Sequence, residues 1–99
     1  YNMKECAGYY AELLLALAGP EVYARTASEK RAGESVAAIR QMNSTLNQLT
    51  GMPITLKDAG VKREQMEEIA QTAQGDGSLV FNREEADFRD ILGILEAAY

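Results

Sequence analysis

The sequence GMPITLKDAGV, residues Gly51–Val61, lies at the middle of a 99-residue chain and decides how the helices are divided. Gly51 supplies the positive φ that commonly ends a helix. Pro53 disfavours helical geometry in the residue before it and cannot continue a helix itself. A helix that approaches from the N-terminal side must therefore stop at this point.

The rest of this stretch predicts one short turn between two helix stops. Thr55 and Asp58 have the spacing of a capping box, and Gly60 can end the turn that they begin. The segment is rich in apolar side chains for a loop, so we expect a hinge over residues 51–61 that is pinned against a core. These side chains are Met52, Ile54, Leu56 and Val61.

A helix from about Ser28 to Thr50 is predicted before the hinge, because apolar residues recur there at steps of three and four. They form one narrow stripe, which consists of Ala32, Val36, Ile39, Met42, Leu46 and Leu49. Thr26 and Glu29 have capping-box spacing, and Ser28 is an alternative cap. Gly33 inside the pattern indicates either close packing or fraying.

An earlier helix is predicted from Met3 to Ala18, with apolar residues almost all round it. We expect this helix to be the most buried one. Gly19 suits its C-terminal end, and Pro20 suits the first position of a new turn over residues 21–25.

Two shorter helices are predicted after the hinge, one from about Arg63 to Gln74 and one over residues 88–99. Asp87 is the expected N-cap of the last helix, with Asp90 in the capping-box position.

The segment between these two helices, Gly75–Ser78, is a loop by composition, and Leu79–Phe81 can be briefly extended. No stretch shows a persuasive alternation typical of strands. The sequence therefore predicts an all-α fold of about five helical segments, with residues 1–99 as a single partial domain.

Composition limits the classes of function. The chain has 15 acidic and 10 basic residues, a net charge of −5, which disfavours nucleic acid and anionic membranes as partners. Cys6 is the single cysteine, so no intramolecular disulfide forms and a cytoplasmic location is expected. The longest mostly apolar run, residues 7–18, is about half of what spans a bilayer and has no secretion-signal pattern. Because the chain begins at Tyr1, we expect an excised or processed piece.

The residues offer little catalytic chemistry. The chain contains no histidine, which excludes Ser-His-Asp and Cys-His catalysis and every metal site that needs histidine. Cys6 lies on the apolar face of its helix and is interpreted as an inert thiol. Glu64, Glu67 and Glu68 are interpreted as solvated surface, and the Gly75–Ser78 loop lacks a P-loop lysine. We therefore nominate no catalytic, cofactor-binding or metal-binding residue in this chain.

The order of residues at the hinge resembles the carboxyl-terminal region of iron-containing alcohol dehydrogenases, which commonly reads G-[ILM]-P-x-x-L-x-[DE]-x-G-V. Tyr1-Asn2 resembles the end of a family helix that reads L-L-P-x-V-M-x-Y-N, and residues 18–24 resemble the segment that follows it. Residues 64–73 resemble the short helix after the hinge motif. The family's final loop and closing helix are matched by Asp76, Gly77, Ser78, Asn82, Glu85 and Asp90-Ile91-Leu92.

The resemblance implies an all-α C-terminal portion of a dehydroquinate synthase-like enzyme whose α/β nucleotide-binding domain lies upstream. Iron or zinc and NAD(P) are implied for that parent enzyme, with the metal held by an aspartate and histidines upstream of Tyr1. The family's final loop lies near the nicotinamide and the substrate, so the resemblance implies an active-site-lining loop of Asp76, Gly77, Ser78 and Asn82. Ser78 stands where the family often has cysteine, and Arg83 stands where it has proline.

The function implied is interconversion of an alcohol with its aldehyde or ketone, while this piece is itself non-catalytic. A glycerol or other polyol dehydrogenase of the same superfamily is a family-level alternative. Its expected partners are the upstream nucleotide-binding domain, the upstream metal-binding helices and further copies of itself. Excised helices would leave apolar patches on the order of several hundred Å² uncovered, which favours self-association. The alternative is a stand-alone acidic helical module for interaction or self-association.

Overall fold

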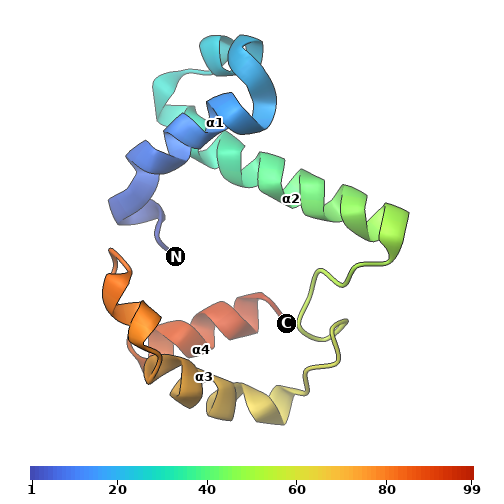
Figure 1. Cartoon of the computed structure of the whole chain (residues 1–99), viewed down its shortest axis with the longest axis vertical. Helices are drawn as coiled ribbons and strands as arrows, with labels where there is room; N and C mark the ends of the chain where they lie inside the picture. Colours follow the sequence, from blue (N-terminus) through green and yellow to red (C-terminus); the bar gives the residue numbers. More distant parts are fainter. The chain divides into compact units, whose positions relative to one another are not determined.

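A computed structural model describes residues 1–99, which form helices and connecting turns without any strand (Figure 1). The all-α prediction is confirmed. The α-helices are α1 (Met3–Arg25), α2 (Arg31–Thr50), α3 (Met66–Gln74) and α4 (Phe88–Ala97), and the 3-10 helices are η1 (Ser28–Lys30), η2 (Arg63–Gln65) and η3 (Gly77–Phe81). None of the helices combines the length and the apolarity that a membrane crossing needs.

The chain divides into two compact units, Tyr1–Met52 and Pro53–Tyr99. The division falls inside the predicted hinge. That all of residues 1–99 make a single domain stays a prediction.

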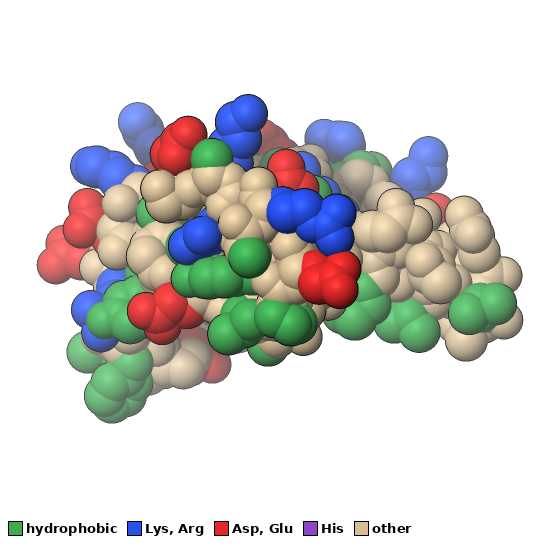
Figure 2. Space-filling view, turned by 90° about the horizontal axis from the view of Figure 1, so that it is seen from above, with side chains coloured by type: hydrophobic (Ala, Val, Ile, Leu, Met, Phe, Trp, Pro, Cys, Tyr) green, Lys and Arg blue, Asp and Glu red, His purple; other side chains and the backbone are tan.

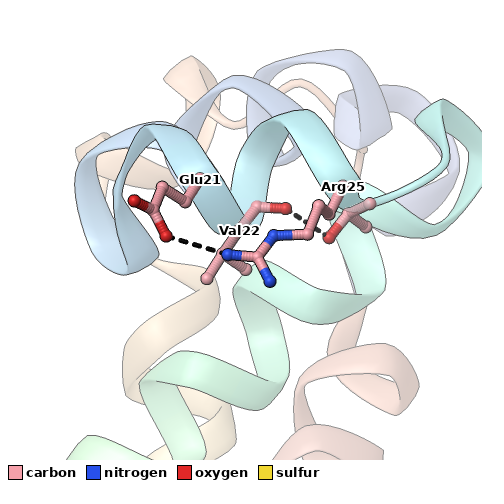
Figure 3. Close-up of polar contacts among 4 residues, drawn as sticks. Glu21, Val22 and Arg25 are labelled. Carbon is pink, nitrogen blue, oxygen red and sulfur yellow. Dashed lines mark hydrogen bonds and ion pairs between the residues drawn. The ribbon is translucent and has the colours of Figure 1, made fainter.

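A sharp kink divides α1 where the sequence predicts a helix stop. Gly19 has φ 83° and ψ 168°, a conformation that glycine adopts without steric cost, and Pro20 begins the second part of the helix. The second part ends at Thr26, whose N–H donates to the Val22 carbonyl at 3.0 Å and whose hydroxyl donates to the same oxygen at 2.7 Å, the second bond being the dashed line at Val22 in Figure 3. Arg25 donates to the Glu21 carboxylate at 2.8 Å, an exposed pair that adds little stability.

The predicted N-terminal cap of the following helix is wrong. The Thr26 hydroxyl donates backward to the Val22 carbonyl at the end of α1, and no side chain accepts from the amides at the start of η1 or α2. Ser28 does not cap the helix either: its hydroxyl donates to the Glu29 carboxylate at 3.3 Å, and the N-cap position of α2 is Lys30. The chain instead passes through η1, and α2 begins at Arg31 without a side-chain cap.

The core of the Tyr1–Met52 unit is a close contact between α1 and α2 (Figure 1). Leu14 of α1 is 1% exposed, and the small residues Ala32 and Ser35 of α2 are buried as well. Ser35 is 0% exposed, and its hydroxyl donates to the Tyr10 carbonyl at 2.6 Å. Small side chains at the contact allow the two backbones to approach each other closely.

The expectation that α1 is the most buried helix is wrong. Leu14 is its one buried residue, while the other large apolar side chains of its first part are exposed or half-buried. The exposed ones are Met3, Tyr9, Leu13, Leu15 and Leu17. Within this unit α1 packs mainly on α2, and one neighbour covers only one face of a helix that is apolar almost all round.

The stripe on α2 divides into a packed half and an exposed half. Val36 and Ile39 are half-buried near Ser35, whereas Met42, Leu46 and Leu49 are exposed. A Cβ added at Gly33 would meet no atom within 4 Å, so the interpretation of this glycine as a site of close packing is wrong. In the space-filling view hydrophobic side chains lie at the surface among charged ones (Figure 2).

The hinge has the predicted stops. Gly51 ends α2 with φ 71°, Gly60 has φ 88°, and the Asp58 N–H donates to the Thr55 hydroxyl at 3.0 Å. The prediction that the hinge is pinned by its apolar side chains is wrong for Met52 and Ile54, which are exposed.

The C-terminal part of the hinge is held more firmly. The Leu56 N–H donates to the Ala98 carbonyl at 2.8 Å, and the Val61 N–H donates to the Leu56 carbonyl at 2.9 Å. Both side chains are half-buried. Backbone hydrogen bonds inside the Pro53–Tyr99 unit therefore hold the C-terminal part of the hinge in place.

We predict opposite effects for alanine at two glycines of α2. Gly51→Ala should destabilise the chain by about 1–2 kcal/mol, because a Cβ is strained at positive φ. Gly33→Ala should stabilise it by up to about 1 kcal/mol, because Gly33 is helical. Neither Cβ meets an atom within 4 Å, so urea unfolding of both variants isolates the backbone effect. Equal shifts in the two variants would contradict this explanation.

In the Pro53–Tyr99 unit, α3 packs against α4 through Met66, Ala70 and Ile91, all of which are buried. The predicted cap of α4 is confirmed. Asp87 accepts from the N–H groups of Arg89 and Asp90 at 2.8 and 2.9 Å, and the Asp90 carboxylate accepts from the Asp87 N–H at 3.0 Å. The hydrogen bonds that the Asp87 carboxylate accepts, that from the Asp90 N–H first, hold the pKa of Asp87 below its ordinary value.

The suggestion that residues 79–81 are extended is wrong, because they belong to η3. The Asp76 carboxylate caps this turn. The backbone N–H and C=O groups of a capped 3-10 turn find partners within the turn, whereas those of a lone strand would have none. Val80 and Phe81 are 84% and 87% exposed.

Candidate functional site

The candidate site is the turn that joins α3 to α4. Asp76 accepts a hydrogen bond from the Ser78 N–H at 2.7 Å, which fixes the start of η3. At the other end of the turn, the Asn82 N–H donates to the Leu79 carbonyl at 3.0 Å, and the Asn82 side-chain amide donates to the Glu84 carbonyl at 2.6 Å. Asp76 and Asn82 therefore hold the two ends of one short, exposed turn.

Two shallow hollows adjoin this turn, and Asp76 lines both. One has a volume of about 280 Å³ and is lined by Gln74, Asp76, Leu79, Val80, Glu85 and Ala86. The other has a volume of about 430 Å³ along α3 and is lined by Gln65, Glu68, Ile69, Thr72, Ala73 and Asp76. Both lie within the Pro53–Tyr99 unit.

The four residues that the sequence singled out therefore separate in space. Asp76 lines the hollows, whereas Gly77, Ser78 and Asn82 line neither and act in the turn itself. Sequence reasoning missed Gln74, Val80 and Ala86, because Gln74 is an exposed residue at the end of α3 and the other two lie outside the α-helices, so none carries a periodic apolar signal. The one available signal was the spacing of Asp76 and Ser78 in the sequence. An aspartate can accept a hydrogen bond from the backbone N–H two residues later, which predicts a turn and hence a concave side.

The electrostatics of the site are set by carboxylates. The hydrogen bonds from the Ser78 hydroxyl and amide hold the pKa of Asp76 below its ordinary value, so Asp76 is ionised at neutral pH. Glu68 and Glu85 line one hollow each. An ionised carboxylate only accepts hydrogen bonds, so the walls suit ligand groups that donate them. No group of three or more His, Cys, Asp or Glu side chains is placed to hold a metal ion.

We predict that Ser78→Ala raises the pKa of Asp76 toward the ordinary value, because the hydroxyl hydrogen bond is the largest cause of the shift. Since the folded pKa is lowered, the stability that Asp76 gives is complete above its unfolded pKa and is lost as the pH falls through the folded pKa. Carboxyl carbon shifts in an NMR titration measure this directly. Ser28→Ala is the control, and an unchanged Asp76 titration in Ser78→Ala would contradict the assignment.

Comparison with known proteins gives the family of this chain. The description "Fe-containing alcohol dehydrogenase family, C-terminal" matches residues 1–99. The comparisons with curated proteins and with solved structures each gave no match. The match covers the hinge, both units and the candidate site, and it confirms the resemblance that was based on residue order. The chain belongs to the Fe-containing alcohol dehydrogenase family and corresponds to its C-terminal part.

Proposed function

We propose that this chain is the C-terminal helical portion of an NAD(P)-dependent, metal-dependent alcohol dehydrogenase, which interconverts an alcohol and its aldehyde or ketone. The family match over residues 1–99 is the observation that carries this proposal. The portion itself is proposed to be non-catalytic and to pack beside the reacting groups.

The residues of this chain do not fit an iron site or a dinucleotide site. It has no histidine, and no cluster of three potential metal ligands. It also has no strand that leads into a glycine-rich helix start, the usual cradle for a dinucleotide pyrophosphate. We therefore propose that iron or zinc and NAD(P) are held by upstream parts of the parent enzyme, and we derive no chemical step for them here.

The proposed partners are the upstream nucleotide-binding domain and the upstream metal-binding helices. Support comes from apolar side chains that each unit leaves exposed, such as Tyr9 and Leu13 on α1 and Val80 and Phe81 in η3. Large apolar groups gathered at a surface are typical of a surface that meets protein. We also propose a cytoplasmic location, because Cys6 forms no disulfide on which the fold depends.

Within this proposal the turn of Asp76, Gly77, Ser78 and Asn82 lines the active site of the parent enzyme. Ser78→Leu in the parent enzyme should then raise KM for the alcohol without changing the bound metal, because bulk in a lining turn obstructs substrate and leaves the ligands intact. Ser28→Leu in the other unit is the matched control. Equal kinetic effects of the two variants would reject this role for the turn.

The direct test of the proposed function uses the 99-residue chain and the parent enzyme side by side. Both are assayed with iron or zinc, with NAD or NADP, and with short alcohols and polyols. Turnover is expected for the parent enzyme only. Appreciable turnover by the chain alone would refute the assignment of the chemistry to upstream residues, and an inactive metal-loaded parent enzyme would refute the dehydrogenase assignment.

A second candidate is a stand-alone helical module for interaction or self-association. The exposed half of the α2 stripe favours it, because three apolar side chains there have no cover within their unit. It predicts that the chain acts by binding alone. Sequencing the parent gene separates the candidates, since an upstream region without a nucleotide-binding loop and without histidines would favour the module.

A further inference from the structure

The segment that carries the inference is the C-terminal part of the hinge, residues 55–61, which we call the hinge loop. Its backbone groups bond mainly to one another. These internal hydrogen bonds run from the Asp58 N–H to the Thr55 hydroxyl at 3.0 Å, from the Ala59 N–H to the Thr55 carbonyl at 3.1 Å, from the Gly60 N–H to the Lys57 carbonyl at 3.0 Å, and from the Val61 N–H to the Leu56 carbonyl at 2.9 Å. All of them stay intact when the loop moves as one body.

One hydrogen bond joins the hinge loop to α4. The Leu56 N–H donates to the carbonyl of Ala98, the C-cap residue of that helix, at 2.8 Å. We call this hydrogen bond the latch. The side chains of Leu56 and Val61 are half-buried, whereas residues 57–60 are exposed. The loop therefore rests against the rest of its unit through few contacts.

A cation–π contact lies beside the latch and supports it. The guanidinium carbon of Arg63 is 4.4 Å from the centroid of the Tyr99 ring. Arg63 is the second residue after the hinge loop, and Tyr99 directly follows Ala98, which accepts the latch. The contact thus ties both sides of the latch together. Arg63 is exposed, and cation–π contacts of exposed groups are weak.

We propose that the hinge loop is a movable strap. The latch and the contact between Arg63 and Tyr99 break together, and the loop leaves α4 with its internal hydrogen bonds intact. The helices α3 and α4 stay packed meanwhile, because buried apolar side chains hold them together. The strap is independent of the dehydrogenase assignment, since it uses only contacts inside the Pro53–Tyr99 unit.

The residues before the hinge loop allow this movement. Pro53 has no N–H to donate, and Ile54 takes part in no hydrogen bond and is 50% exposed. Segments with few hydrogen bonds and little burial open at low free energy. Opening of the strap would lengthen the free connection between the two units from residues 53–54 to residues 53–61.

The experiment is amide hydrogen exchange of the 99-residue chain, measured for single residues by NMR. Opening of the strap exposes the Leu56 N–H, whereas the Val61 N–H keeps its acceptor inside the loop. Tyr99→Ala should therefore raise the exchange rate of Leu56 roughly two- to fivefold, the factor that corresponds to one exposed cation–π contact. The exchange rates of Val61 and of Ala70 in α3 should not change.

Three further variants isolate the contact. Arg63→Ala should raise the exchange rate of Leu56 as much as Tyr99→Ala does. Tyr99→Phe keeps the aromatic ring and should leave that rate as it is in the unchanged chain. Lys57→Ala is the matched control, because it removes the same charge from the hinge loop itself and leaves the ring contact in place.

An unchanged Leu56 rate in Tyr99→Ala or in Arg63→Ala would overturn the proposal. An equal rise at Val61 would overturn it too, because the loop would then unfold instead of moving as one body. An equal rise at Ala70 would mean that α3 and α4 separate, and this outcome also contradicts a strap that opens alone.

Discussion

Leu14→Ala is expected to destabilise the Tyr1–Met52 unit by about 2–5 kcal/mol, the cost of a cavity at a well-packed leucine. Leu14 is 1% exposed and is the one buried residue of α1. Small units have stabilities of only a few kcal/mol, because they bury a small share of their surface. The expected result is therefore extensive opening of α1 and α2 at room temperature.

Amide hydrogen exchange measures this prediction separately for each unit. Protection of α1 and α2 should collapse in Leu14→Ala, while α3 and α4 should keep theirs, since they lie in the other compact unit. Leu13→Ala is the matched control, because the same side chain is removed from the neighbouring position, which is 44% exposed. If Leu13→Ala were as damaging as Leu14→Ala, the assignment of the core would be wrong.

The sequence was most informative where a structure depends on a few neighbouring residues. Gly51 ends α2 because a positive φ suits glycine, and Asp87 caps α4 through amides two and three residues away. Thr55 receives the Asp58 N–H in the same local manner. Such signals are complete within one turn of chain, so they can be predicted without knowledge of the tertiary structure.

Local signals misled where two of them competed for one side chain. The Thr26 hydroxyl could accept from an amide of the helix that follows or donate to a carbonyl of the helix that precedes it, and in the structure it donates to the Val22 carbonyl while no side chain caps η1. The sequence motif Thr26-Ala27-Ser28-Glu29 shows only the first option. The second option depends on how α1 resumes after the kink at Gly19, which the motif does not contain.

Burial could be predicted least, because it depends on what covers each face. Leu13, Leu14 and Leu15 are identical in type, yet only Leu14 is buried. Periodicity predicts the stripe of α2 but not its cover: Ala32 is buried and Val36 and Ile39 are half-buried, whereas Met42, Leu46 and Leu49 are exposed. The same reasoning applies to the candidate site. The role of Asp76 in the turn is local, but one of the two hollows is also lined by Gln74 and Ala86, which the turn motif does not contain.

Ser35→Leu should destabilise the Tyr1–Met52 unit by about 3 kcal/mol or more, because it overfills a close helix contact and removes a hydrogen bond. Ser35 is 0% exposed, and its hydroxyl lies 2.6 Å from the Tyr10 carbonyl. The larger side chain must push α1 and α2 apart, which also loosens the packing around Leu14. Urea unfolding followed by circular dichroism gives the change in the free energy of unfolding.

Two further variants separate volume from hydrogen bonding at this contact. Ser35→Ala keeps the space but loses the hydroxyl, and it should cost only about 0.5–1.5 kcal/mol. Ala37→Leu adds the same bulk at an exposed position of α2 and should change stability by no more than about 0.5 kcal/mol. A cost for Ser35→Ala equal to that for Ser35→Leu would show that the hydrogen bond to Tyr10, and not the close approach of the helices, holds this unit together.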